Sequence, residues 1–128
     1  MTGYRIRNEP LDDGSLVVVR GNRLERETLR VDAMAAHARF GQYGISVFAA
    51  EDAGAIDDLA RARLARFEWL TITTVADLRR AGLEIIPTFR RPHCTILLPD
   101  LEADLDRLLR CHTAVAINPH HESDEDEQ

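Results

Sequence analysis

The stretch from Thr88 to His93 holds the densest set of side chains that could do chemistry in this chain. Its histidine can exchange a proton near neutral pH, and the neighbouring Arg90 and Arg91 can stabilise the charge of a pentacovalent phosphate or an oxyanion. Metal-independent cleavage of RNA uses that combination. The alternative is structural, because adjacent arginines in a turn are usually solvated and a lone histidine often serves packing.

Two other stretches bring polar side chains to places where a sheet could present them. Arg20 follows four apolar residues and precedes a glycine, so its guanidinium could emerge beside a main chain that an anion can approach. Tyr43 and Ser46 stand beside two glycines, which also permit close approach. The structural alternatives are that Arg20 covers the end of the core and that Tyr43 packs on the surface.

Neighbouring histidines and cysteines raise the question of a metal site, but their spacing argues against one. The pairs are His93 with Cys94 and Cys111 with His112. Residues next to each other on a strand point to opposite faces, and no C-x-x-C or H-E-x-x-H motif occurs. The chain also lacks a P-loop, a G-x-G-x-x-G motif and a G-x-S-x-G nucleophile elbow. We therefore expect neither a metal nor a cofactor.

The charge of the chain is concentrated at its C-terminal end. Five of the 22 acidic residues lie within residues 121–128, which leaves 17 acidic residues against 16 basic ones in the rest of the chain. A nearly neutral body offers no wide basic field, so we do not expect binding to double-stranded DNA. We expect residues 1–120 to form a single globular domain and residues 121–128 a disordered acidic tail.

Composition also suggests a compartment and a source. The apolar fraction of 45% suits a globular protein, and no apolar run approaches the ~20 residues that a membrane helix needs. The first residues lack the apolar core of a secretory signal, so a cytoplasmic protein without membrane contact is expected. Two cysteines are few for a disulfide scaffold, which favours reduced thiols. All 16 basic residues are arginines, as is typical of a GC-rich bacterial genome.

The elements that must position these groups follow from apolar periodicity and turn residues. β-branched and apolar runs predict strands at 16–19, 45–50, 69–73, 84–89 and 94–98, with a further short strand at 113–117. Helical spacing predicts helices that begin after Asn22, Asp52, Thr74 and Asp100. The expected fold is α+β, with an α/β-like order of elements and a single mixed β-sheet of five or six strands covered by three or four helices.

Two details of this prediction bear on the site. The segment 90–92 is short enough to join its flanking strands as a hairpin, and Pro87 places the first of these strands at an edge or a bulge. The first helix should turn one face to the core, with Leu24, Thr28, Val31, Ala35 and Ala38.

Part of the sequence resembles known families. Arg20 and Ser46 resemble the opening of the R-S-E pattern of mono-ADP-ribosyltransferases, which implies that they position NAD and that Glu84 stabilises a ribosyl cation. The stretches YGISVFA (43–49) and PTFRRPH (87–93) are similar to those of small bacterial proteins of uncharacterised activity. In size and charge layout the chain also resembles toxins of toxin–antitoxin pairs.

These observations lead to two hypotheses. The first is a small bacterial enzyme that acts on RNA or a nucleotide-like substrate, as the toxin of a toxin–antitoxin pair. The second is a non-catalytic interaction module that binds a protein partner or its own copy through the sheet edge near Pro87 or an apolar helix face. Under the first hypothesis, the expected catalytic residues are His93, Arg20 and Arg90, and the expected substrate-binding residues are Tyr43, Ser46 and Thr88.

Overall fold

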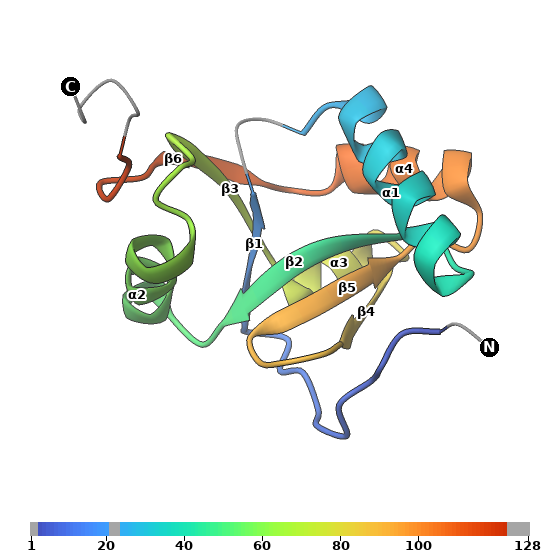
Figure 1. Ribbon diagram of the computed structural model, residues 1–128, viewed down its shortest axis with the longest axis horizontal. Coiled ribbons are helices and arrows are strands. Elements are labelled where there is room, and N and C mark those ends of the chain that lie inside the picture. The colour runs from blue at the N-terminus through green and yellow to red at the C-terminus, as the bar shows by residue number, and fades with distance from the viewer. Residues whose placement is uncertain (1–2, 21–23, 123–128) are drawn as a thin grey trace.

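The computed structural model describes residues 3–20 and 24–122, with the main chain alone for Arg20 (Figure 1). Six strands form one sheet in the order β4-β5-β2-β1-β3-β6, and four helices accompany them. The strands are β1 (Leu16–Arg20), β2 (Gly44–Ala50), β3 (Trp69–Thr74), β4 (Glu84–Pro87), β5 (His93–Leu97) and β6 (Ala114–Ile117). The helices are α1 (Arg26–Phe40), α2 (Ala53–Arg63), α3 (Val75–Arg80) and α4 (Leu101–Arg110).

The α+β fold expected from the sequence is confirmed, with one difference in the sheet. Every pairing between described strands is antiparallel, so the sheet is not mixed. The reason lies in the helical connections. The segment containing α1 leaves the sheet where β1 ends and returns to the same end, so β2 runs back beside β1 instead of crossing over to run parallel to it.

Most of the core lies on one face of the sheet, which we call the first face. Helices α1, α3 and α4 pack there. Strand residues alternate between the two faces, and the odd-numbered residues of β1 and β2 point to this one. The buried side chains include Val17, Val19, Leu29, Ala33, Ile45, Val47, Val75, Leu78, Ile96, Leu105 and Leu108.

The opposite, second face is covered by a helix over only part of its width. There α2 packs on Val18 and Leu70 through Leu59, Ala60 and Leu64. Figure 1 shows α2 well separated from α1 and α4. The second face of β2, β5 and β4 extends beyond this helix, and the N-terminal segment lies against it, as described below.

The exposed face of α1 differs from the prediction. Leu29 and Ala33 are its buried residues, whereas Val31 is 58% exposed and Met34 is 55% exposed. The expectation that Val31 lies in the core is therefore wrong, as it is for Thr28, Ala35 and Ala38, which are also exposed. The helix carries apolar residues on both sides, so its sequence pattern alone does not determine its rotation.

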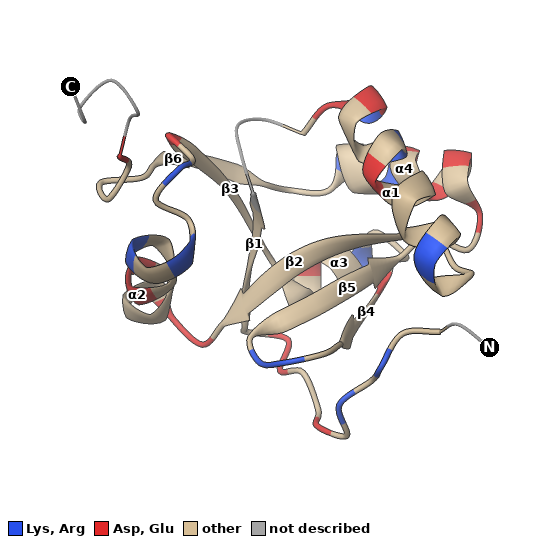
Figure 2. Cartoon of the chain, viewed as in Figure 1, with Lys and Arg blue, Asp and Glu red and all other residues tan. Residues whose placement is uncertain are grey.

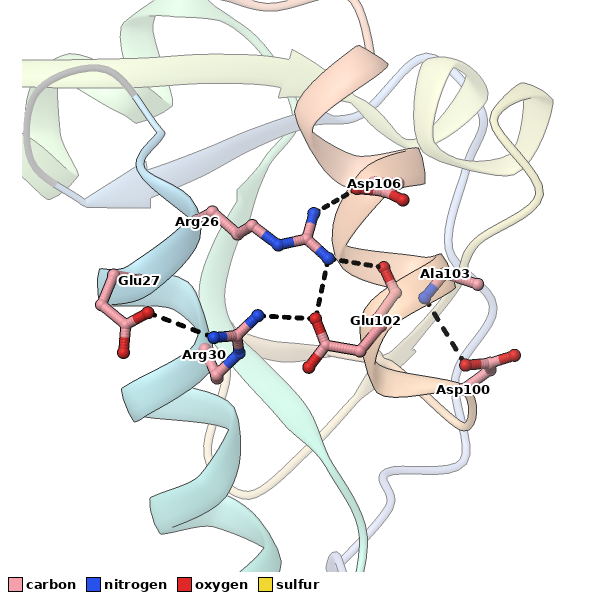
Figure 3. Close-up of polar contacts among 7 residues, drawn as sticks. All are labelled: Arg26, Glu27, Arg30, Asp100, Glu102, Ala103 and Asp106. Atoms are coloured by element: carbon pink, nitrogen blue, oxygen red, sulfur yellow. Dashed lines mark hydrogen bonds and ion pairs between the residues drawn. The ribbon is translucent and has the colours of Figure 1, made fainter.

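An ionic network also links α1 to α4 (Figure 3). Glu102 of α4 accepts hydrogen bonds from Arg26 at 2.8 Å and from Arg30 at 2.6 Å. Arg26 also pairs with Asp106, and Arg30 with Glu27 at 3.2 Å. These arginines link α1 to α4, while Val31 and Met34 of the same helix remain exposed.

Several helix ends follow the predicted capping chemistry. Asp52 accepts a hydrogen bond from the Ala55 N–H at 2.9 Å, and Thr74 accepts one from the Asp77 N–H at 3.0 Å. Gly41 ends α1 with a positive φ of 78°, as a glycine C-cap does. The predicted cap at Asn22 lies outside the described residues.

The chain after β6 is anchored to the end of α2. The buried Asn118 side chain donates to the carbonyls of Leu64 at 2.9 Å and Phe67 at 3.0 Å. Farther along, the Glu122 N–H donates to the Ala65 carbonyl at 2.7 Å. Ordered contacts therefore continue to Glu122, and the rest of the expected acidic tail, residues 123–128, lies outside the described residues. No helix in the described parts of the chain is long and apolar enough to span a membrane.

Candidate functional site

The connection between β4 and β5 brings two of the predicted site residues together. The Thr88 hydroxyl lies 2.7 Å from His93 Nδ1 and 2.7 Å from the Thr95 hydroxyl. Thr88 is fully buried, and its N–H donates to the His93 carbonyl at 3.1 Å, which closes the hairpin. The hydroxyl pair therefore holds the imidazole in one orientation, as a group that transfers a proton requires.

Arg7, from the N-terminal segment, holds this connection in place. Its Nη1 donates to the carbonyls of Thr88 at 2.6 Å and His93 at 2.8 Å, and more weakly to that of Phe89 at 3.3 Å. Its Nε donates to Glu9 at 2.9 Å. No sequence pattern indicated this role, because Arg7 belongs to no periodic element and its carbonyl partners lie more than 80 positions away.

Four rings gather beside the connection, and we call Tyr4, Phe40, Phe89 and His93 the ring cluster. Ring centroids lie 4.7 Å apart for Tyr4 and Phe40, 5.3 Å for Phe40 and Phe89, and 5.2 Å for Phe89 and His93. All four side chains are half-buried, so each keeps part of its surface in contact with solvent. Phe48 of β2 meets His93 edge-on at 6.0 Å.

Gly44 makes room for the ring cluster on the second face. A side chain at this position would overlap the Tyr4 hydroxyl and would lie 2.6 Å from Thr95 Cγ2. The Tyr4 hydroxyl instead reaches the Gln42 carbonyl, to which it donates at 3.3 Å. Burial raises the pKa of Tyr4, so this hydroxyl stays protonated. The glycine noted in the sequence thus permits the N-terminal segment to rest on β2.

Three exposed arginines adjoin the ring cluster in sequence, namely Arg5, Arg39 and Arg90. Within residues 3–20 and 24–122, none of them forms an ion pair. The guanidinium of Arg39 lies 5.4 Å from the Phe40 ring centroid, within cation–π range. Figure 2 shows basic stretches in the N-terminal segment, at the end of α1 and in the β4–β5 connection. Exposed cations without an ion pair in the described structure therefore neighbour three of the half-buried rings in sequence, and Arg39 also contacts one of them in space.

The remaining predicted residues are only partly brought together. Ser46 of β2 lies opposite Thr95 of β5 on the second face, and Thr95 in turn contacts Thr88. Arg90 lies in the β4–β5 connection itself. Tyr43 packs instead against the first-face core and stacks on His37 at 4.3 Å, so it lies on the other side of the sheet. The main chain of Arg20 pairs with Leu70 at the end of β1, and its side chain lies outside the described atoms.

The residues of the R-S-E resemblance occupy three different strands. Arg20 ends β1, Ser46 lies in β2 and Glu84 begins β4. The strand order places β2 and β5 between β1 and β4. Glu84 is exposed at the edge of the sheet.

A groove of about 800 Å³ lies next to the connection. Its walls come from the N-terminal segment, the end of β2 and the β4–β5 connection. It is lined by none of the five predicted site residues whose side chains are described, namely His93, Arg90, Tyr43, Ser46 and Thr88. Two arginines on its walls, Arg7 and Arg91, both pair with Glu9. Their hydrogen bonds, that of Arg91 first, lower the pKa of Glu9, so the carboxylate stays charged and occupies both cations.

Neither cysteine has the surroundings of a reactive thiol. Cys94 and Cys111 are both free and buried. Burial raises the pKa of each thiol, which disfavours the thiolate. His93 and Cys94 follow one another on β5, with Cys94 facing the first-face core, so the two side chains point to opposite faces.

Compared with protein-family models, curated proteins and solved structures, this chain shows no match. Its function must therefore be argued from its own residues.

Proposed function

We propose that the ring cluster and its bordering arginines bind single-stranded RNA or a nucleotide-like ligand, and that His93 transfers a proton in its cleavage. The observation that carries this proposal is the contact of four half-buried rings, three of which have an exposed arginine next to them in sequence that forms no ion pair in the described structure. Aromatic rings accept unpaired bases by stacking, and guanidinium groups bind phosphate through two parallel hydrogen bonds. Stacking of unpaired bases on aromatic side chains is one of the common modes of RNA recognition.

The enzyme part of the proposal rests on the environment of His93. The Thr88 hydroxyl fixes one ring nitrogen, and Arg90 lies three residues away in the same connection. A positioned imidazole can move a proton to or from a ribose hydroxyl, while a guanidinium stabilises the extra charge on phosphorus. Thr88 therefore positions the catalytic group, Arg90 binds phosphate, and Ser46 offers a hydroxyl on the same face.

Binding is tested with a fluorescein-labelled oligouridylate by fluorescence anisotropy. The double variant Arg5→Ala/Arg90→Ala should bind about tenfold more weakly or worse, and the slope of log affinity against log salt should shrink by about 1.4, since each phosphate contact to a single strand contributes about 0.7. Phe40→Leu keeps the apolar volume but removes a stacking ring, at a cost of about 1–3 kcal/mol of binding free energy. The control Arg63→Ala/Arg66→Ala removes exposed arginines at α2 and should change neither quantity.

Equal losses in the test and control variants would show that binding follows overall charge and would refute the proposed surface. Absence of binding by the unaltered chain at low salt would refute the proposal as a whole.

Cleavage is tested separately on the same oligonucleotide by gel analysis of fragments. His93→Gln should abolish cleavage and leave the thermal midpoint nearly unchanged. Because the substitution also removes a ring of the cluster, binding should weaken by no more than it does in Phe40→Leu, and cleavage is compared at protein concentrations that saturate the oligonucleotide. Full activity in this variant would remove His93 from the mechanism. If the unaltered chain binds but never cleaves, the catalytic part fails and the binding part stands.

A toxin of a toxin–antitoxin pair is the physiological role that fits this activity best. Expression in a bacterial host should then arrest growth, and His93→Gln should relieve the arrest at equal protein level. Growth that continues unchanged with the unaltered chain would count against a toxin.

A further inference from the structure

Strand β6 forms one edge of the sheet and exposes all four of its residues. Ile117 is 65% exposed and Val115 is 44% exposed, and the strand carries no charge. Proteins usually protect an edge strand with charged residues, proline or a covering segment, because an open edge pairs readily with another strand. In the described part of the chain β6 has none of these protections.

The register of β6 shows which of its main-chain N–H and C=O groups form no hydrogen bond to β3. The Asn118 N–H donates to the Glu68 carbonyl at 2.8 Å, one residue beyond the Trp69–Ile117 pair. In an antiparallel ladder this bond makes Trp69–Ile117 a non-hydrogen-bonded pair, and such pairs alternate with hydrogen-bonded ones. The N–H and C=O groups of Val115 and Ile117 therefore point away from β3, and no described segment accepts them.

The opposite edge of the sheet, β4, is already occupied in part. The Arg7 N–H donates to the Pro87 carbonyl at 2.9 Å, and the Phe89 N–H donates to the Arg5 carbonyl at 2.8 Å. The N-terminal segment thus covers the end of β4 where the sequence suggested an open edge near Pro87. Head-to-tail growth that joins β6 of one copy to β4 of the next is obstructed there.

We propose that β6 pairs antiparallel with β6 of a second copy of this chain, an inference that does not depend on RNA binding. With the twofold axis at Ala116, the open main-chain groups of Val115 face those of Ile117 from the other copy, and four hydrogen bonds form. The side chains of Val115 and Ile117 point to one face, beside the half-buried Trp69, so the two copies join their apolar residues in one cluster.

Charge also favours this antiparallel arrangement. The exposed Arg110 precedes β6 and the exposed Glu122 follows it. An antiparallel pair brings the basic end of one copy toward the acidic end of the other, whereas a parallel pair brings like charges together. The contact uses the same strand on both copies, so it closes at two chains. A four-residue strand buries a small area, so the dimer should dissociate on dilution.

The test is the mass of the full chain, measured by sedimentation equilibrium over roughly a hundredfold range of concentration. The mass should rise from 14.4 kDa toward twice that value. Val115→Pro removes an outward N–H without removing a bond to β3, and Ile117→Lys places a charge in the apolar cluster. Both variants should stay monomeric with an unchanged circular dichroism spectrum. The control Met34→Lys adds the same charge to the other exposed apolar surface, on α1, and should still dimerise.

Four results would overturn the proposal: a monomer at every concentration, a dimer that persists in Ile117→Lys, a dimer that is lost in Met34→Lys, or an assembly larger than two chains. If Val115→Pro fails to fold, Ile117→Lys decides the outcome, because its side chain is mostly exposed in the single chain. Monomers at every concentration that instead bind an extended peptide at β6 would identify a different protein as the occupant.

Discussion

Replacing Arg7 with methionine should destabilise the fold more than replacing any fully exposed arginine. Methionine keeps an unbranched apolar chain but donates no hydrogen bond, so the carbonyls of Thr88 and His93 lose their charged partner. Each hydrogen bond to a charged group contributes about 1.5 kcal/mol or more, and partial exposure reduces the total, so we expect a loss of about 2–3 kcal/mol. For a chain of 128 residues the entropy of unfolding is roughly 0.27 kcal/mol/K, which converts the loss to about 7–11 °C in Tm.

The assay is thermal and urea unfolding, with Arg61→Met as the matched control. Arg61 is 62% exposed in its side chain and pairs with Asp57 and Asp58 on the surface of α2. Exposed pairs of this kind are worth about 0.2–1 kcal/mol, so the control should shift the midpoint little. Equal shifts in Arg7→Met and Arg61→Met would refute the idea that Arg7 holds the β4–β5 connection.

The pH dependence supplies a second readout of the same contact. Arg91 and Arg7 lower the pKa of Glu9, so its stabilising effect is fully present above the ordinary glutamate pKa. That effect is lost as the pH falls through the lowered value. The difference in Tm between Arg7→Met and the unaltered chain should therefore narrow in acid, as both lose the charge of Glu9.

Two further substitutions test the packing around the site and at the end of the chain. Gly44→Ala should lower the free energy of unfolding in urea by about 1–3 kcal/mol, because the added carbon overlaps Tyr4 and Thr95. The control Gly54→Ala in α2 has space for the added carbon and should be neutral or stabilising. Equal effects of the two substitutions would contradict the close approach of Tyr4 to Gly44. Asn118→Ala should cost about 2–3 kcal/mol in thermal unfolding, since the carbonyls of Leu64 and Phe67, the first buried and the second partly buried, lose their donor. A change below about 0.5 kcal/mol would argue against this anchor.

Local sequence signals predicted most elements of this fold. Asp52 and Thr74 act as helix caps because a capping side chain and its target N–H lie within three residues of each other. Strand β1 was evident because its apolar residues are consecutive and buried on both faces. The rotation of α1 was mispredicted because Val31 and Leu29 offer apolar surface on different sides.

Sequence patterns predicted less of the candidate site than of the fold. His93 and Thr88 were found because they lie in one short stretch, and a hairpin brings them together. The contributions of Tyr4 and Arg7 were missed because the N-terminal segment has no periodic pattern, and its contacts depend on the tertiary fold. Sequence spacing also failed to separate Tyr43 from Ser46, which the alternation of strand residues places on opposite sides of the sheet.

Arg7 bonds to residues far along the chain, so these hydrogen bonds form late during synthesis of the protein. Its carbonyl partners lie 81 to 86 positions later in the sequence, so during synthesis the segment around Arg7 cannot make these contacts until the β4–β5 hairpin has been made. Contacts between such distant parts of a chain form slowly, because a long loop must close before they give any stability. The ring cluster can therefore form only once His93 has been synthesised, and a ligand that needs the cluster can bind only after that point in translation.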